Sequence, residues 1–223
     1  MTTWDDFIAI EADNISREAR KRLSSRIEQN NQIYKNIGSG IDKIFNKLTR
    51  MEMREHGPVE VVRDDENHRE WETAFSVVNM AGNSVVHLIL SGYYLQAITL
   101  VRQELEGLAQ LEHITQGSRV NNKAPNIVVL DAEIRKFYGE LSEGAHLANH
   151  DITALQAPMP TGFDRYYAQL PHGPSLIPRY SHEVADGIFN VHIKIREELN
   201  GCLHRHIAKL FPSCAHGERS GGK

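Results

Sequence analysis

The chain has 223 residues, of which 40% are hydrophobic and 24% charged, and its formal net charge is −4. A chain of this length can bury a substantial core, and its mild acidity argues against nucleic-acid binding over the whole surface. The N-terminus is acidic, and no stretch approaches the run of about 18 apolar residues that a membrane helix needs. Two cysteines, Cys202 and Cys214, fit a reducing compartment. We therefore expect a cytoplasmic protein that does not contact a membrane.

Apolar residues recur at helical spacing along most of the chain. The pattern predicts helices over about 13–34, 41–56, 64–90, 94–114, 128–150 and 181–210. The glycines of 38–40 should separate the first helix from the second, and Gly57-Pro58 should end the second. Residues 59–62 could be extended, although two apolar residues are thin evidence for a strand. Gly92 alone separates the third and fourth helices, which predicts that they are antiparallel neighbours.

These elements predict an all-α protein built as an up-and-down helical bundle. We expect an N-terminal helical arm over 1–57, a bundle over 58–212 and a flexible tail over 213–223. Residues 151–179 contain five prolines and three aromatic residues. A connection of that length inside a compact domain is usually functional or disordered.

The helix over 94–114 contains the first candidate site. Arg102 lies beside the apolar face, and Glu106 follows one turn later, within reach of an ion pair. Ser142, His146 and His150 lie on a later helix and could line the same interhelical groove. His146 and His150 also have a spacing that metals use, but no second Glu-x-x-His completes a di-iron site. The simpler interpretation of Arg102 and Glu106 is a stabilising pair on a polar surface.

A second candidate is Arg63 with His68, an arginine and a histidine separated by four residues. The pair resembles the Arg-polar-x-x-x-His motif of helical ribonucleases of the HEPN class, which implies metal-independent cleavage through the RNA 2′-hydroxyl at a dimer interface. The residues between them include three carboxylates, which are unsuited to a phosphate backbone. The alternative is that these acidic residues mark the start of a helix, where the macrodipole favours them.

The C-terminal region offers a possible metal site. Cys202 and His206 are one helical turn apart, and Cys214 and His216 follow in the tail. Two thiolates and two imidazoles suit a structural zinc ion. The alternative is one buried cysteine on a helix and a mobile tail, and no other cofactor is predicted.

The first helix contains five cations within ten residues, at Arg17, Arg20, Lys21, Arg22 and Arg26. Such a run could contact RNA or an acidic partner. Carboxylates are interspersed with these cations, so we favour a solvated face on which neighbouring charges balance each other.

Residues 97–106 have the pattern A-x-x-L-x-R-x-x-x-E, and residues 138–146 have the pattern Y-x-x-L-S-x-x-x-H. The pair resembles a group of bacterial helical proteins that are similar in architecture to the HEPN bundles of toxin–antitoxin and phage-defence systems. The resemblance covers about residues 64–150. It implies a helical bundle and a homodimer, and it implies nuclease activity only if Arg63 and His68 meet across such a dimer.

Two functions therefore remain open. The first, which we favour, is a non-catalytic module whose groove near Arg102, Glu106 and His146 binds a protein or a small anion. The second is an endoribonuclease. It would use Arg63 and His68, or it would use His146 as general base with Arg102 stabilising the developing phosphorane charge.

Overall fold

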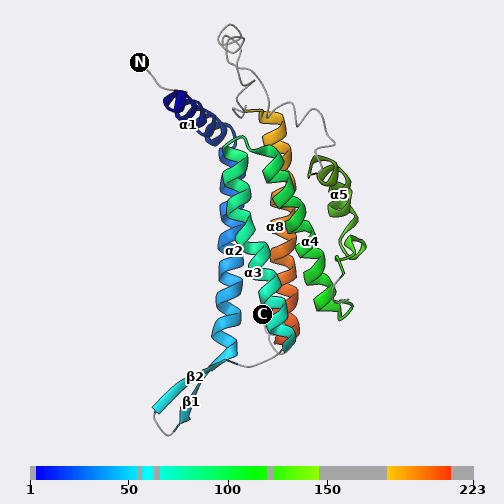
Figure 1. Ribbon diagram of the computed structural model, residues 1–223. Coiled ribbons are helices and arrows are strands. Elements are labelled where there is room, and N and C mark those ends of the chain that lie inside the picture. Colours follow the sequence, from blue (N-terminus) through cyan, green and yellow to red (C-terminus); the bar gives the residue numbers. More distant parts are fainter. Residues whose placement is uncertain (1–3, 55–56, 63–65, 120–122, 146–179, 212–223) are drawn as a thin grey trace, which may run out of the picture.

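The computed structural model describes residues 4–54, 57–62, 66–119, 123–145 and 180–211 (Figure 1). Its elements in chain order are α1 (Trp4–Arg22), α2 (Ser24–Leu48), β1 (Thr49–Arg54), β2 (Gly57–Val62), α3 (Glu66–Leu90), α4 (Tyr94–Gln116), η1 (Ile127–Val129), α5 (Ala132–Ala145) and α8 (His182–Leu210). Helices α2, α3, α4, α5 and α8 lie roughly along one axis and alternate in direction along the chain (Figure 1). The prediction of a helical bundle is therefore confirmed.

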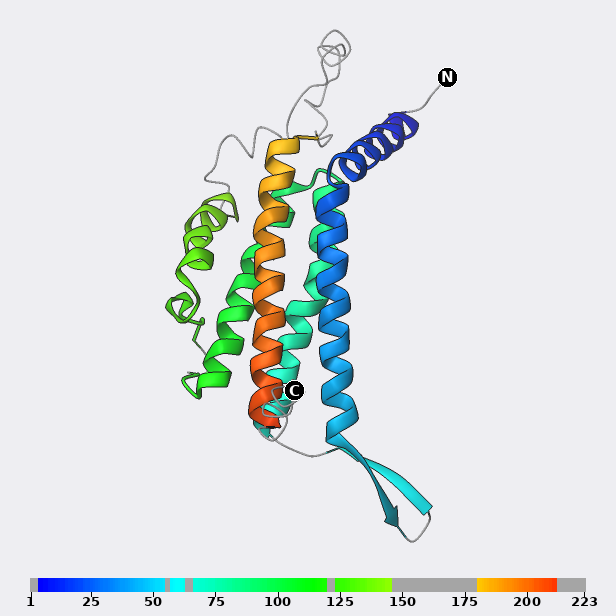
Figure 2. The ribbon, with the colours of Figure 1, turned by 180° about the vertical axis from the view of Figure 1, so that it is seen from behind.

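Helix α8 is the central element of the bundle. It packs against α2, α3, α4 and α5, and α3 packs most extensively against α4. Helix α5 covers the outer side of α4, whereas α1 leans away from the bundle and the β-hairpin projects from its opposite end (Figure 2). Within the predicted arm over 1–57, α1 extends away from the bundle, whereas α2 contributes side chains to the core of the bundle.

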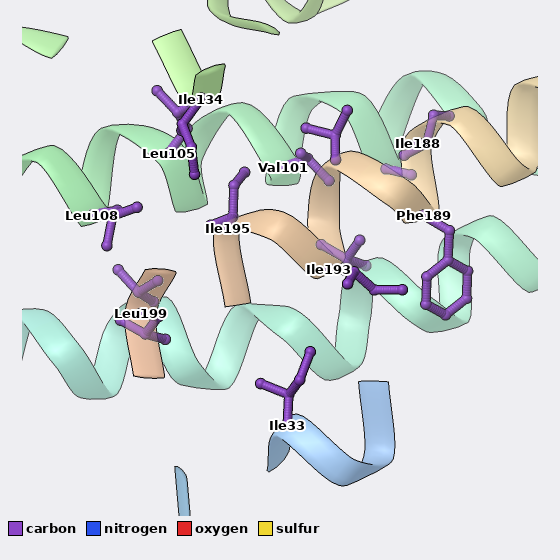
Figure 3. Close-up of a cluster of buried hydrophobic side chains, with 14 of the residues drawn as sticks. Ile33, Val101, Leu105, Leu108, Ile134, Ile188, Phe189, Ile193, Ile195 and Leu199 are labelled. Atoms are coloured by element: carbon purple, nitrogen blue, oxygen red, sulfur yellow. The ribbon is translucent and has the colours of Figure 1, made fainter. Parts of the chain in front are cut away.

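The core is a continuous set of aliphatic and aromatic side chains contributed by every long helix. Figure 3 shows Ile33 from α2, Val101 and Leu105 from α4, and Phe189 and Ile193 from α8 facing a common interior. These residues repeat at the three- and four-residue steps that place side chains on one helical face. The short connection between α3 and α4 is also as predicted, with Gly92 at φ 77°. This left-handed conformation favours glycine.

The predicted break at 38–40 and the predicted helix over 41–56 are wrong. Helix α2 continues through the glycines and ends at Leu48, and an antiparallel hairpin follows in which Met51 opposes Glu60. At Gly40 a Cβ would lie only 3.2 Å from the Cγ of Leu203 on α8. Because glycine allows the two helices to approach this closely, the packing gained offsets its low helix propensity.

One helix among the described residues, His68–Leu90 within α3, is long and apolar enough to cross a membrane by length and composition alone. The inner face of this helix contributes Trp71, Phe75 and Val78 to the core of the bundle. The predicted helix over 128–150 begins later than expected, since η1 precedes α5, and residues 146–150 lie outside the described residues.

Candidate functional site

A polar and aromatic cluster lies between α3 and α8 at the end of the bundle nearest the hairpin. Nδ1 of His68 is 2.9 Å from Nε2 of His206, and both side chains are buried. The indole of Trp71 stacks on the ring of His206, with 3.9 Å between centroids and 4° between planes. The structure thus brings together His68, which was predicted as a catalytic residue, and His206, which was predicted as a metal ligand. No pattern along the chain pairs these two residues, which lie 138 positions apart.

The two histidines form a hydrogen bond rather than a chelating pair. Their rings are nearly coplanar, at 13°, and their centroids are 5.2 Å apart. With the two nitrogens only 2.9 Å apart, this separation requires rings that meet edge to edge, so that an N–H of one points at the lone pair of the other. Chelation requires both lone pairs to converge on a third point. The described residues contain no group of three side chains suited to hold a metal ion.

Cys202 lies one turn before His206 on the same helix and is fully buried. Burial raises the pKa of its thiol to about 12, and the nearby charge of Glu112 acts in the same direction. Arg205 bonds to Glu112 and, at 2.7 Å, to Glu198, so it bridges α4 and α8. The other two predicted zinc ligands, Cys214 and His216, lie outside the described residues.

Arg102 and Glu106 form the predicted ion pair, at 3.1 Å, and a third residue completes it. Tyr138 on α5 donates its hydroxyl hydrogen to Glu106 at 3.1 Å and accepts from Arg102 at 3.4 Å. The hydrogen bond to Tyr138 is the largest influence that raises the pKa of Arg102. Ser142 lies one turn beyond Tyr138 and is half-buried. This triangle fastens α5 to α4.

Not all of the predicted groove can be placed. His146 and His150 lie outside the described residues, as does Arg63. The guanidinium group of Arg102 is engaged by Glu106 and Tyr138, so an anion would have to compete with both.

A fully buried charged network, which was not predicted from the sequence, lies in the middle of the bundle. Nδ1 of His192 is 2.7 Å from Glu104, whose other carboxylate oxygen lies 4.0 Å from Arg196. Arg196 also donates to the carbonyl of Val78 at 3.2 Å and to the side chain of Asn79. Glu104 lies three residues after buried Val101, and Arg196 lies three residues after buried Ile193, so helical spacing from the apolar face was the available signal.

An apolar groove opens between α5 and the first half of α8, and we call it the α5–α8 groove. Its volume is about 370 Å³, and its lining residues are Ile98, Phe137, Glu140, Leu141, Glu183, Val184, Gly187, Ile188, Asn190 and Val191. The charged members of this lining, Glu140 and Glu183, are both carboxylates. Lys136 and Lys194 lie over the ring of Phe137, 5.3 and 5.6 Å from its centroid. The groove therefore has a mostly apolar lining with two carboxylates in it, and two lysines lie at the ring of Phe137.

The cationic run over 17–26 spans the end of α1 and the start of α2, and three of its five cations pair with carboxylates, in keeping with the interpretation that we favoured. Arg17 pairs with Asp13, and Arg22 pairs with Glu18. Arg26 reaches Asp186 on α8 at 2.8 Å.

Comparison with known proteins adds no further constraint: no family model, no curated protein and no solved structure matches this chain.

Proposed function

We propose that this chain is a non-catalytic interaction module that binds an apolar helical segment of a partner protein in the α5–α8 groove. The observation that carries the proposal is the groove itself. Its volume lies in the range that ligand pockets occupy, and most of its lining side chains are apolar. An amphipathic helix that lays its apolar face into such a groove gains about 1.5–3 kcal/mol for each large side chain it buries.

The charges around the groove specify the partner further. Glu140 and Glu183 favour basic residues on the bound segment, because opposite charges across an interface speed association and exclude wrong partners. Lys136 and Lys194 sit at Phe137, so the basic residues of the partner should gather away from that ring. The occupant that fits is an apolar helix with lysine or arginine toward one end.

The geometry at His68 favours this binding function over an endoribonuclease. The ring of His68 is 6% exposed, and its Nδ1 is bonded to His206. It would have to leave that bond and reach solvent before it could take a proton from an RNA 2′-hydroxyl group. The adjoining cavity has a volume of about 150 Å³, which is below the range of roughly 300–1,000 Å³ that ligand pockets occupy.

Gly187 provides a direct test, because it lines the groove and a Cβ there would meet nothing within 4 Å. Gly187→Leu should fill the groove without disturbing the fold. Gly139→Leu is the matched control, since Gly139 is an exposed helical glycine with equal room that does not line the groove. The probe is a fluorescein-labelled amphipathic helix of leucine and lysine, compared with the same peptide carrying glutamate for lysine.

Fluorescence anisotropy should show that the wild type and Gly139→Leu bind the lysine peptide alike. Gly187→Leu should bind it at least about tenfold more weakly, and the glutamate peptide should bind more weakly to all three. Undiminished binding by Gly187→Leu, or no binding by the wild type, would refute the proposal. RNA cleavage by the wild type that is lost in a folded His68→Ala variant would replace the proposal with the endoribonuclease.

A further inference from the structure

The outward face of α3 carries an unusual stripe. Thr73, Val77, Met80, Ser84 and His87 are all exposed and follow one another at steps of four, three, four and three residues. Val77 is 67% exposed and Met80 is 74% exposed. The chain has no Asp, Glu, Lys or Arg from residue 73 to residue 101. The solvent face of a helix in a globular protein is normally charged, whereas this face, on which Ser76 and Asn83 are also exposed, is uncharged around the apolar Val77 and Met80 and suits a contact surface.

The inner side of α3 holds the helix in the bundle. Trp71 and Phe75 are buried in the core, and Arg196 donates to the carbonyl oxygens of Val78 and Asn79. A membrane would have to accept the buried charges of Arg196 and Glu104 directly behind the helix, which is costly in hydrocarbon. These buried charges favour protein rather than lipid on the outer side of α3.

We propose that the outer face of α3 binds the same face of a second copy of this chain, with the two helices antiparallel across a twofold axis at Met80. Alternating steps of three and four residues are the spacing that lets two helices interlock at a shallow crossing angle. The stripe is self-complementary, because in this arrangement the small Thr73 opposes His87 and Val77 opposes Ser84.

The polar side chains at the ends of the stripe fit the antiparallel orientation. Glu72 begins the exposed face and His87 ends it. Opposing the helices about Met80 places Glu72 of one copy beside the partner's His87, whereas a parallel pairing would place like groups together. From Thr73 to His87 the stripe is about 21 Å long at 1.5 Å per residue. One helix pair of this length buries less than a standard interface, so we expect micromolar dimerisation.

Sedimentation velocity over a wide concentration range tests the interface, and it does so independently of the α5–α8 groove. The wild type should shift from monomer to dimer as its concentration rises. Met80→Lys should remain monomeric, because the two lysines would meet at the axis. Val128→Lys is the matched control, since Val128 is 63% exposed and lies in η1, away from the stripe, and it should dimerise like the wild type.

A cross-link provides a second readout. Met80→Cys should form an intermolecular disulfide on mild oxidation, because residues at a twofold axis face each other, whereas Val128→Cys should not. A wild type that is monomeric at every concentration would overturn the proposal, and so would a Met80→Lys variant that still dimerises. Wild-type monomer that sediments with lipid vesicles would show that the stripe serves a membrane instead.

Discussion

Glu104 and His192 lie 2.7 Å apart between α4 and α8, and neither side chain reaches solvent. Arg196 lies 4.0 Å from the second carboxylate oxygen of Glu104, so a buried anion faces a buried cation with an imidazole alongside. Burying a charge is costly unless it is paired and hydrogen-bonded. The three residues therefore depend on one another, and each is costly to remove alone.

His192→Ala should lower the free energy of unfolding by about 3–5 kcal/mol, because it leaves Glu104 without its closest partner and opens a cavity. Glu104→Gln should cost less, since the amide keeps the shape and can still bond to His192. Urea denaturation monitored by circular dichroism measures both. Equal losses for the two variants would contradict this argument, because Glu104→Gln opens no cavity and leaves no carboxylate without its partner.

Two glycines on long helices should respond in opposite ways to alanine. At Gly82 a Cβ would overlap the hydroxyl of Tyr34 and lie 3.2 Å from Arg196, whereas at Gly187 it would meet nothing within 4 Å. Gly187→Ala should stabilise by about 0.5–1 kcal/mol through helix propensity. Gly82→Ala should destabilise by about 1–3 kcal/mol, because Tyr34 and Arg196 must move.

Thermal unfolding of the two alanine variants beside the wild type provides the measurement. Both variants gain the helix propensity of alanine, but only the alanine at position 82 meets neighbouring side chains, so the difference between the two measures the cost of packing. A rise in melting temperature for both variants would mean that α2 can shift away from α3 without loss.

The sequence predicted those features that depend on neighbours along one helix. The Arg102–Glu106 pair follows from a four-residue step, and the α3–α4 connection follows from Gly92. Features that depend on contact between distant helices were not predictable in this way. The His68–His206 bond, for example, requires knowledge of which faces of α3 and α8 meet.

The effect of the glycines at 38–40 also depends on contact with a distant helix. The glycines of 38–40 suggested a break because glycine weakens an isolated helix. In the bundle, Gly40 allows α2 to approach Leu203 of α8, so its effect depends on the neighbouring helix. Local propensity could not distinguish a helix that ends at glycine from one that packs closely through it.

The ion pair between Arg26 and Asp186 should make stability depend on pH in acid. The hydrogen bond from Arg26, together with its charge, lowers the pKa of Asp186 below the ordinary value of 3.8. A carboxyl group with a lowered folded pKa stabilises the protein above its unfolded pKa and loses that contribution as pH falls through the folded pKa. Arg26→Ala should therefore destabilise at pH 6, and its difference from wild type should shrink below pH 3.

Chemical denaturation at several pH values measures this difference. Arg20→Ala removes an exposed cation from the neighbouring helix and controls for the change in net charge. A loss for Arg26→Ala that stays constant from pH 6 to pH 2 would show that Arg26 contributes by packing against α8 rather than through Asp186.

The Cys202 thiol should be protected from alkylation in the folded protein. Burial raises its pKa to about 12, so at pH 8 about one molecule in ten thousand would carry the reactive thiolate, and the sulfur has no solvent contact. In a Cys214→Ser background, where Cys202 is the remaining cysteine, iodoacetamide should give no adduct until denaturant is added. Adding Val128→Cys to this background supplies an exposed thiol that should react in the folded state. If Cys202 reacted as fast as that thiol, the end of α8 would have to open readily, and the stacked Trp71–His206 pair beside it could not be a fixed element of the core.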